Sequence, residues 1–189
     1  GLVEDHIVNC KNIMKDDWYR QCFPGTVIDQ KKDTATDFKT TARGRYYGAG
    51  ILGTITGKGA GYVLCDDPLK PDEALSDTIR VETNKAIRNT LFSRFNDPRT
   101  GKFIMIMQRL HEDDPTGNLL KDQGYTLLKL PAEAISHPTI ITLGEKHWVM
   151  KKGDLLFPDR LTRDVLDEKR RDMLDYNYAG QYLQEPVPL

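Results

Sequence analysis

The fold is decided by the stretch Gly61-Tyr62-Val63-Leu64-Cys65-Asp66-Asp67-Pro68. Its apolar residues would occupy both faces of a strand, which predicts a parallel sheet covered by helices. Ligands of such sheets bind beyond the carboxyl ends of the strands, where Asp66 and Asp67 would emerge. Two adjacent carboxylates there suit a hard cation such as Mg²⁺ and the activation of a nearby water molecule. The alternative is an ordinary Asp-Pro turn after the strand, because both residues are common in turns.

A second apolar run, at residues 103–107, predicts another buried strand. Between the two strands, residues 76–95 carry one apolar stripe at helical spacing, and Ser76 is a suitable N-cap. A strand–helix–strand unit of this length has parallel strands, so both carboxyl ends lie at one edge of the sheet. We therefore expect Gln108 and Arg109 to lie near the two aspartates. The alternative for Arg109 is a structural salt bridge to one of those aspartates.

The segment from Gly53 to Ala60 is rich in glycine but departs from the P-loop pattern. That motif needs four residues between its glycines, Ser or Thr after the lysine, and a helix afterwards. Here three residues separate Gly53 from Gly57. Gly59 follows Lys58, and a strand is predicted next. We therefore expect a bend that brings the backbone close to a ligand or a neighbouring strand, and no Walker A motif.

Residues 111–114, His-Glu-Asp-Asp, have the composition of a metal site. However, Asp114 followed by Pro115 is also a common helix start, with Asp as N-cap and Pro in the first turn. We favour the capping role for Asp113 and Asp114. We expect His111 to contact a metal-ligating residue rather than to bind the metal itself.

The other elements are predicted from shorter patterns. The helices are expected at residues 1–14, around the stripe Val165, Leu166, Met173 and Leu174, and around Tyr176, Tyr178 and Tyr182. The strands are expected at residues 37–42, 46–50, 125–130, 139–142 and 148–150. The tyrosines are interpreted as packing residues, and residues 184–189 as a linker that leads out of a domain.

The composition argues against a generally basic DNA-binding protein, a cysteine-based metal site and a membrane-spanning helix. The chain has 189 residues, with 27 basic and 28 acidic side chains and a formal net charge of -1, so any contact with DNA must come from local patches. Cys10, Cys22 and Cys65 lack metal-ligand spacing and fit a reducing, cytoplasmic setting. No apolar stretch approaches the ~20 residues that a membrane-spanning helix needs.

Several segments together resemble the ATPase domain of a phage terminase large subunit, the motor that packages viral DNA into preformed capsids. The resemblance covers nearly the whole chain. It is carried by TITGKGA (54–60), DDPLKPDEA (66–74), NDPRTG (96–101), MQRLHEDD (107–114) and YAGQYLQEP (178–186). The last of these is similar to the segment that leads toward the nuclease domain of the family.

The resemblance implies an α/β fold with a partly parallel sheet flanked by helices, an incomplete additional-strand P-loop ATPase fold. This domain would span residues 1–175, and residues 176–189 would begin a linker. The Walker A motif would lie before residue 1 and the nuclease domain after Leu189, so we expect a truncated domain that hydrolyses ATP negligibly alone. The implied partners are double-stranded DNA, the portal protein, the terminase small subunit and further copies in a ring, in the bacterial host cytoplasm and away from membranes.

The resemblance also implies roles for the residues at the strand ends. Asp66 would hold Mg²⁺ on ATP. Asp67 would orient the attacking water, although the family usually has the longer glutamate there. Gln108 and Arg109 match the coupling segment, which senses the nucleotide and transmits its state to DNA movement.

This sequence lacks a basic residue at a position where the family has one. Related motors place an arginine at the position of Thr56, so its contact with phosphate charge would fall to Lys58, Arg43 or Arg45. The same three cations support a different function, a non-catalytic module that binds DNA or another phage protein.

A metal-dependent nuclease is the remaining alternative. Asp66, Asp67, Glu73 and Glu112 would supply its carboxylates, and Lys70 a charge near the scissile phosphate. Against this reading, the spacing from Asp67 to Lys70 does not reproduce the acid-any-lysine core that is common in nucleases.

Overall fold

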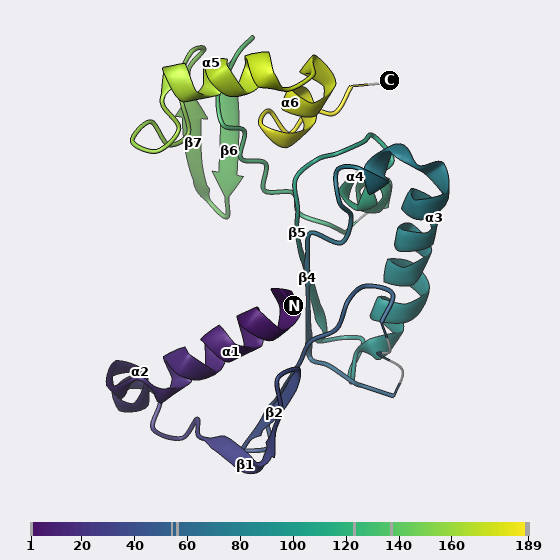
Figure 1. Ribbon diagram of the computed structural model, residues 1–189, viewed down its shortest axis with the longest axis vertical. Coiled ribbons are helices and arrows are strands. Elements are labelled where there is room, and N and C mark those ends of the chain that lie inside the picture. The colour runs from purple at the N-terminus through teal and green to yellow at the C-terminus, as the bar shows by residue number, and fades with distance from the viewer. Residues whose placement is uncertain (1, 54, 56, 123, 137, 188–189) are drawn as a thin grey trace. The chain divides into compact units, whose positions relative to one another are not determined.

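The computed structural model describes all residues except 1, 54, 56, 123, 137 and 188–189. The described residues form a mixed α/β protein with small sheets, and they divide into two compact units, Gly1–Thr56 and Gly57–Leu189. We call these unit 1 and unit 2 and describe each by itself (Figure 1). The division falls within the glycine-rich segment that was expected to bend.

Unit 1 packs an amphipathic helix against an antiparallel sheet. Its elements are α1 (Leu2–Lys15), α2 (Asp17–Cys22), β1 (Ile28–Asp33), β2 (Asp37–Thr40) and β3 (Arg45–Tyr47). β2 pairs with both β1 and β3, and Ile7 and Met14 of α1 pack on Phe38 of β2. The predicted helix and the β2–β3 hairpin are confirmed. β1 was not predicted, because its sequence Ile-Asp-Gln-Lys-Lys-Asp has no apolar alternation.

A buried carboxylate ties the strands of unit 1 together. Nε and Nη2 of Arg45 donate to the two oxygens of Asp37 at 2.7 and 2.6 Å, and Nζ of Lys32 lies 3.2 Å from the same carboxylate. The hydrogen bonds from Arg45 hold the pKa of Asp37 well below its usual range, although burial acts in the opposite direction. Asp37 therefore links β2 to both of its neighbours as a charged group.

Replacing Asp37 with Asn should make the stability of unit 1 less dependent on pH. Because folding lowers the pKa of Asp37, its contribution is complete above the unfolded carboxyl pKa of about 3.9 and is lost as the pH falls below it. We expect D37N to lower the free energy of unfolding by about 1–3 kcal/mol at pH 7, and by progressively less below about pH 4. Urea unfolding in a W148F background, where Trp18 alone reports on unit 1, measures this.

The matched control is Asp16→Asn. It removes an exposed carboxylate from the same unit, and the Asp16 side chain makes no capping hydrogen bond. Its unfolding free energy should follow the same pH dependence as the parent protein. If D37N does so as well, the proposed link between Asp37 and acid stability is wrong.

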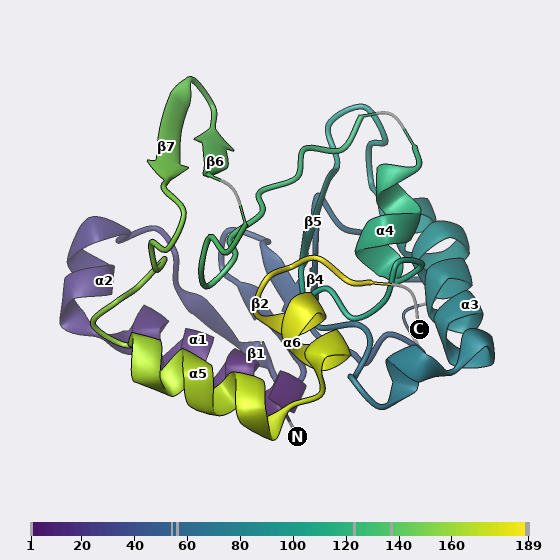
Figure 2. The same cartoon turned by 90° about the horizontal axis from the view of Figure 1, so that it is seen from above.

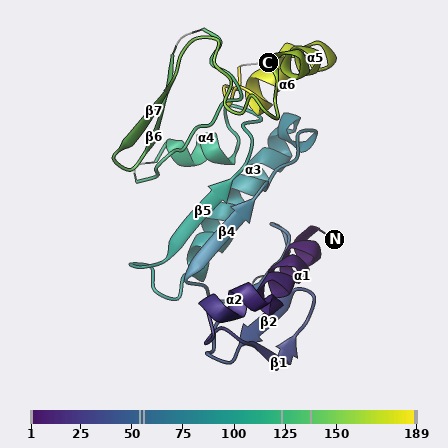
Figure 3. The same ribbon diagram turned by 90° about the vertical axis from the view of Figure 1, so that its left-hand side faces the viewer.

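Unit 2 contains the predicted strand–helix–strand arrangement. β4 (Tyr62–Asp66) and β5 (Lys102–Ile106) are parallel, with Tyr62 opposite Lys102 and Asp66 opposite Ile106 (Figure 3). The crossover consists of η1 (Glu73–Leu75), α3 (Asp77–Lys85), the π-helical turn η2 (Ala86–Leu91) and the 3₁₀ turn η3 (Phe92–Arg94). The Ser76 hydroxyl accepts a hydrogen bond from the Ile79 N–H, which confirms the predicted N-cap.

The helical crossover covers one face of the β4–β5 pair. On that face Cys65 is buried, and the rings of Phe92 and Phe103 meet edge to face at 5.0 Å. On the other face Tyr62 is 74% exposed and Leu64 58% exposed. The expectation that β4 would be buried on both faces is therefore wrong. Within the described residues, its apolar run reflects a pair of strands with a helical layer on one side only.

The rest of unit 2 consists of further helices and a β-hairpin. The elements are α4 (Pro115–Leu120), β6 (Thr139–Leu143), β7 (Lys146–Met150), α5 (Arg163–Asp172) and α6 (Asp175–Gln181). α4 lies beside α3 (Figure 2), and Arg88 Nε in the crossover donates to Asn118 Oδ1 at 2.8 Å. The two short strands expected near residues 140 and 149 are confirmed, and they pair with each other as β6 and β7.

Residues 125–130, predicted as a third strand, do not pair with any described strand. Leu127 and Leu130 are partly exposed rather than buried. The chain turns instead toward the C-terminal residues, where the Ala132 N–H donates to the Tyr182 carbonyl at 2.7 Å. An apolar run indicates a strand only if a partner edge is available, and none is supplied here within the described part of the chain.

The C-terminal helix packs on unit 2 through its tyrosines. Tyr178 is buried, its hydroxyl donates to Glu133 Oε1 at 2.5 Å, and its ring stacks on Tyr182 at 5.1 Å. Arg163 of α5 forms an ion pair with the other oxygen of Glu133. The interpretation of these tyrosines as packing residues is confirmed. No helix among the described residues is both long and apolar enough to cross a membrane.

Candidate functional site

The carboxyl ends of β4 and β5 meet at one edge of the pair. Asp66 is opposite Ile106, and the Asp67 N–H donates to the Ile106 carbonyl at 2.9 Å. We call the residues at these strand ends, 66–67 and 107–109, the carboxyl rim. The parallel register brings the end of β5, two residues before Gln108, to the same edge as the end of β4, and the parallel direction of these strands is as the sequence predicted.

Asp67 has a left-handed backbone conformation. Its φ of 38° is unusual for a residue other than glycine, and Asp is among the residues that tolerate it best. The next residues, Pro68 and Leu69, are buried, and Leu69 joins an apolar cluster with Ala74 and Leu110. The sharp turn at Asp67 therefore directs the chain from the strand into this cluster. Burial of Leu69 offsets the strain, and the Asp67 side chain stays exposed at the rim.

Arg109 points to a different aspartate from the one expected. Its Nε lies 2.9 and 3.2 Å from the two carboxylate oxygens of Asp114, so the alternative of a salt bridge to Asp66 or Asp67 named the wrong partner. Asp114 is 0% exposed and also accepts hydrogen bonds from the N–H groups of Leu110 and Gly117, at 2.9 and 2.7 Å. The predicted N-cap role of Asp114 is thus confirmed, and the same carboxylate fixes Arg109.

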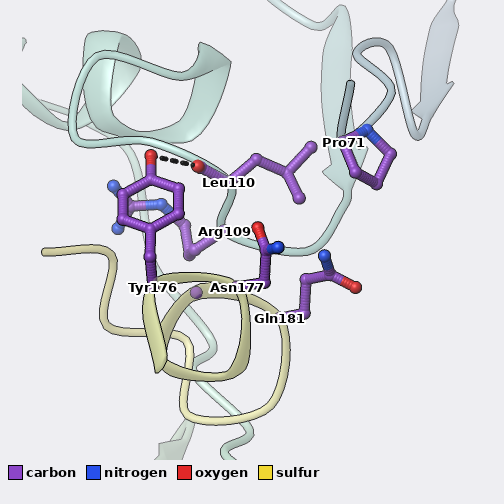
Figure 4. A pocket seen from close by; sticks show the side chains of 7 residues that line it. Pro71, Arg109, Leu110, Tyr176, Asn177 and Gln181 are labelled. Atoms are coloured by element: carbon purple, nitrogen blue, oxygen red, sulfur yellow. Dashed lines mark hydrogen bonds between the residues drawn. The ribbon is translucent and has the colours of Figure 1, made fainter. Parts of the chain in front are cut away.

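The segment after β5 is also tied to the C-terminal part of unit 2. The Tyr176 hydroxyl donates to the Leu110 carbonyl at 2.8 Å (Figure 4). The Arg109 N–H donates to Gln184 Oε1 at 3.1 Å. α6 approaches so closely that a Cβ on Gly180 would lie 2.5 Å from the Arg109 carbonyl oxygen. Arg109 and Leu110, which follow β5, are therefore anchored both by Asp114 and by the C-terminal residues.

A small pocket lies between these groups. It contains about 180 Å³ of empty space, and its lining residues include Pro71, Arg109, Leu110, Tyr176 and Gln181 (Figure 4). Ligand pockets in proteins usually measure about 300–1,000 Å³. This pocket is too small for a nucleotide.

The predicted phosphate-binding cations do not belong to the carboxyl rim. Lys58 precedes β4 and so lies at the amino end of the strand, opposite to Asp66. Arg43 and Arg45 are in unit 1, where Arg45 is engaged by Asp37. Thr56, the position that the family would fill with arginine, lies outside the described residues.

The chemistry of the carboxyl rim is that of carboxylates and amides. Burial, together with the charge of Asp66, raises the pKa of the Cys65 thiol to about 11, so this cysteine stays protonated at neutral pH. Among the described residues, no group of three or more His, Cys, Asp and Glu side chains could hold a metal ion. The acids of the carboxyl rim are Asp66 and Asp67, and both are exposed.

The neighbouring acidic cluster has a structural role. The Nδ1 of His111 accepts a hydrogen bond from the Asp113 N–H at 3.0 Å. The Asp113 carboxylate forms an ion pair with Lys121, which lowers its pKa. These contacts stabilise the turn before α4.

Sequence reasoning missed the residues that hold the coupling segment from the C-terminal side. Tyr176, Gly180 and Gln184 are 66–75 residues away from their partners in the chain. A glycine and a glutamine at such a distance carry no pattern that would assign them to this segment. No protein-family model matches the sequence, and no curated protein matches it either.

Removal of the Asp114 carboxylate should destabilise unit 2 strongly. Asp114→Ala leaves Arg109 without its partner and leaves the N–H groups of Leu110 and Gly117 without an acceptor. Loss of one member of a buried ion pair costs about 3–5 kcal/mol. Urea unfolding in a W18F background, where Trp148 alone reports on unit 2, gives the change in the free energy of unfolding.

The neighbouring residue provides the control. Asp113→Ala breaks an exposed ion pair with Lys121, and solvent-exposed pairs of this kind add little to stability. Similar losses for D113A and D114A would contradict the structural role assigned to Asp114.

Proposed function

We propose that this chain is part of the ATPase domain of a phage terminase large subunit, and that it carries the Walker B strand and the coupling segment. The observation that supports the proposal most directly is the parallel register of β4 and β5. Both strands end at one edge with this register, and the sequence has Asp66 and Asp67 at the end of β4 and Gln108 two residues after β5. This edge is where open α/β sheets bind their ligands.

Each residue of the carboxyl rim then has a distinct task. Asp66 would hold Mg²⁺ bound to ATP, and the metal would neutralise charge on the phosphates. Asp67 would accept a hydrogen bond from the attacking water and orient it. Gln108 would sense the state of the bound nucleotide, because its amide can donate and accept hydrogen bonds at the same edge.

Arg109 has a positioning role in this proposal. Its guanidinium is held by Asp114 and its N–H by Gln184, so it anchors Gln108 rather than contacting phosphate. Movement of Gln108 would then be transmitted through Arg109 to α6 and to the residues that follow it. This route supports the assignment of the segment to coupling.

Hydrolysis by this chain alone should be negligible. The glycine–lysine segment at residues 57–60 leads into β4 and not into a helix, so it offers no helix N-terminus to the β- and γ-phosphates. The missing phosphate contacts would come from a Walker A motif elsewhere in the full protein. DNA, the portal protein, the small subunit and a ring of further copies belong to the same proposal.

Metal–nucleotide binding at the carboxyl rim can be tested by NMR with Mn²⁺ in place of Mg²⁺. Bound Mn²⁺ broadens the resonances of nearby amides, and this effect detects even weak binding. In the presence of ATP we expect broadening centred on residues 65–68 and 107–109. Asp66→Asn should abolish most of it, because the carboxylate that holds the metal is removed.

The control for this experiment is Asp72→Asn. Asp72 is an exposed acid in the next turn, and its side chain makes no capping hydrogen bond. D72N should leave the broadening unchanged. Broadening that persists in D66N, or that centres on another acidic segment, would contradict the proposed metal site.

Phosphate release from ATP by the purified chain should not exceed the background rate. The expected reason is the lack of a phosphate cradle, so D66A and the parent protein should give equal rates. Mg²⁺-dependent turnover that is lost in D66A would contradict the predicted inactivity, although it would support the assignment of the site.

A metal-dependent nuclease is less well supported by the same residues. The Glu73 carboxylate forms an ion pair with Lys70 and accepts a hydrogen bond from the Lys70 backbone N–H. The acids that the nuclease would need, Asp66, Asp67, Glu73 and Glu112, do not form a metal-binding group among the described residues. Plasmid cleavage with Mn²⁺ that is lost in D67A would favour the nuclease.

A further inference from the structure

The outer face of the β2–β3 hairpin in unit 1 carries a group of cations. The strand register places Lys39 directly opposite Arg45, and Asp37 directly opposite Tyr47, all on one face. Phe38 lies on the opposite face, which packs into the core of unit 1. The outer face is therefore a polar surface built on regular strands.

The arrangement of charge on this face is unfavourable for the isolated protein. Like charges directly opposite each other in a sheet repel, as Lys39 and Arg45 do here. The carboxylate of Asp37 is already shared between Arg45 and Lys32. Lys39 is exposed and its side chain forms no ion pair with the described residues, and the same holds for Arg43 in the turn of the hairpin.

The central cation of the group is held in a fixed orientation. Both Nε and Nη2 of Arg45 donate to Asp37, and the guanidinium lies over the Tyr47 ring at 5.7 Å from its centroid. A cation fixed in this way loses little conformational entropy when it meets an anion. Lys39 lies opposite Arg45 in the sheet, and Arg43 lies two residues before it in the turn of the hairpin; both side chains are exposed.

We propose that this surface, Lys32, Lys39, Arg43 and Arg45, binds the phosphate backbone of double-stranded DNA. Lys39 and Arg45 are directly opposite each other, with Cβ atoms about 5 Å apart, and Lys32 and Arg43 lie in the neighbouring strand and the turn, so the hairpin offers several adjacent positive charges to phosphate groups. The whole chain has a net charge of -1, so attraction to a polyanion has to be local. The inference rests on the proposed function for its choice of duplex DNA, and it deepens that function by naming where the duplex is held.

The test is fluorescence anisotropy of a labelled DNA duplex with the 189-residue chain, without nucleotide, at several salt concentrations. The double variant K39Q/R43Q should bind about 10-fold more weakly than the parent chain at physiological salt. The slope of log K against log salt should fall by about 2, because two phosphate contacts are lost. Both side chains are exposed, so the melting temperature should not fall.

The matched control is K151Q/K152Q, which removes the same charge from two exposed lysines of unit 2. It should leave the slope nearly unchanged. Equal losses in the two double variants, or no binding by the parent chain at low salt, would overturn the proposal. Tighter binding to poly-glutamate or to vesicles of anionic lipid than to DNA would also overturn it, in favour of a protein or membrane partner.

This experiment is independent of the test of the nucleotide site. Binding of the duplex does not need Asp66, so D66N should bind DNA like the parent chain. A failure of the Mn²⁺–ATP experiment together with K39Q/R43Q-sensitive DNA binding would remove the ATPase proposal and retain the DNA surface. The opposite pair of results would retain the ATPase proposal alone.

Discussion

The parallel pairing of β4 with β5 is the constraint on which the rest of unit 2 depends. Parallel strands need a long crossover, and the crossover from η1 to η3 supplies it and covers one face of the pair. The same pairing brings residues that are about 40 positions apart in the chain to one edge. Asp67 completes the arrangement, because its N–H continues the ladder by donating to Ile106 and its backbone then turns the chain into the core.

A second buried interaction, the ion pair between Asp114 and Arg109, fixes the segment that follows β5. The Asp114 carboxylate caps α4, accepts a hydrogen bond from the Leu110 N–H and forms an ion pair with Arg109. One side chain therefore joins the start of α4 to the segment after β5. Tyr176 and Gln184 extend this anchor to the C-terminal part of unit 2. Arg109 and Leu110 are therefore connected both to the start of α4 and to the C-terminal residues.

Local sequence signals predicted the helix starts correctly, because a single capping residue determines where a helix begins. Ser76 and Asp114 were identified as helix caps because capping depends on residues within a few positions of each other. The parallel direction of β4 and β5 followed from the length of the crossover. The identity of the residues at the carboxyl rim could thus be predicted, and so could the edge at which they meet.

The failed predictions concern partners that lie far away in the chain. An apolar run does not reveal how many layers cover a strand, so the exposure of Tyr62 and the unpaired segment at residues 125–130 were not foreseen. Arg109 had several carboxylates within reach, and the choice of Asp114 depends on the turn before α4. The division of the chain into two units and the polar strand β1 left no signal in composition or periodicity.

The relative direction of β4 and β5 can be measured with pairs of spin labels on the exposed face, in a variant that lacks the native cysteines. One pair occupies positions 62 and 102, and the other occupies positions 62 and 106. The parallel register predicts backbone separations of about 5 Å for the first pair and about 14 Å for the second, so the second distance should exceed the first by about 9 Å. A shorter distance from 62 to 106 than from 62 to 102 would mean antiparallel strands, and it would separate the aspartates from Gln108.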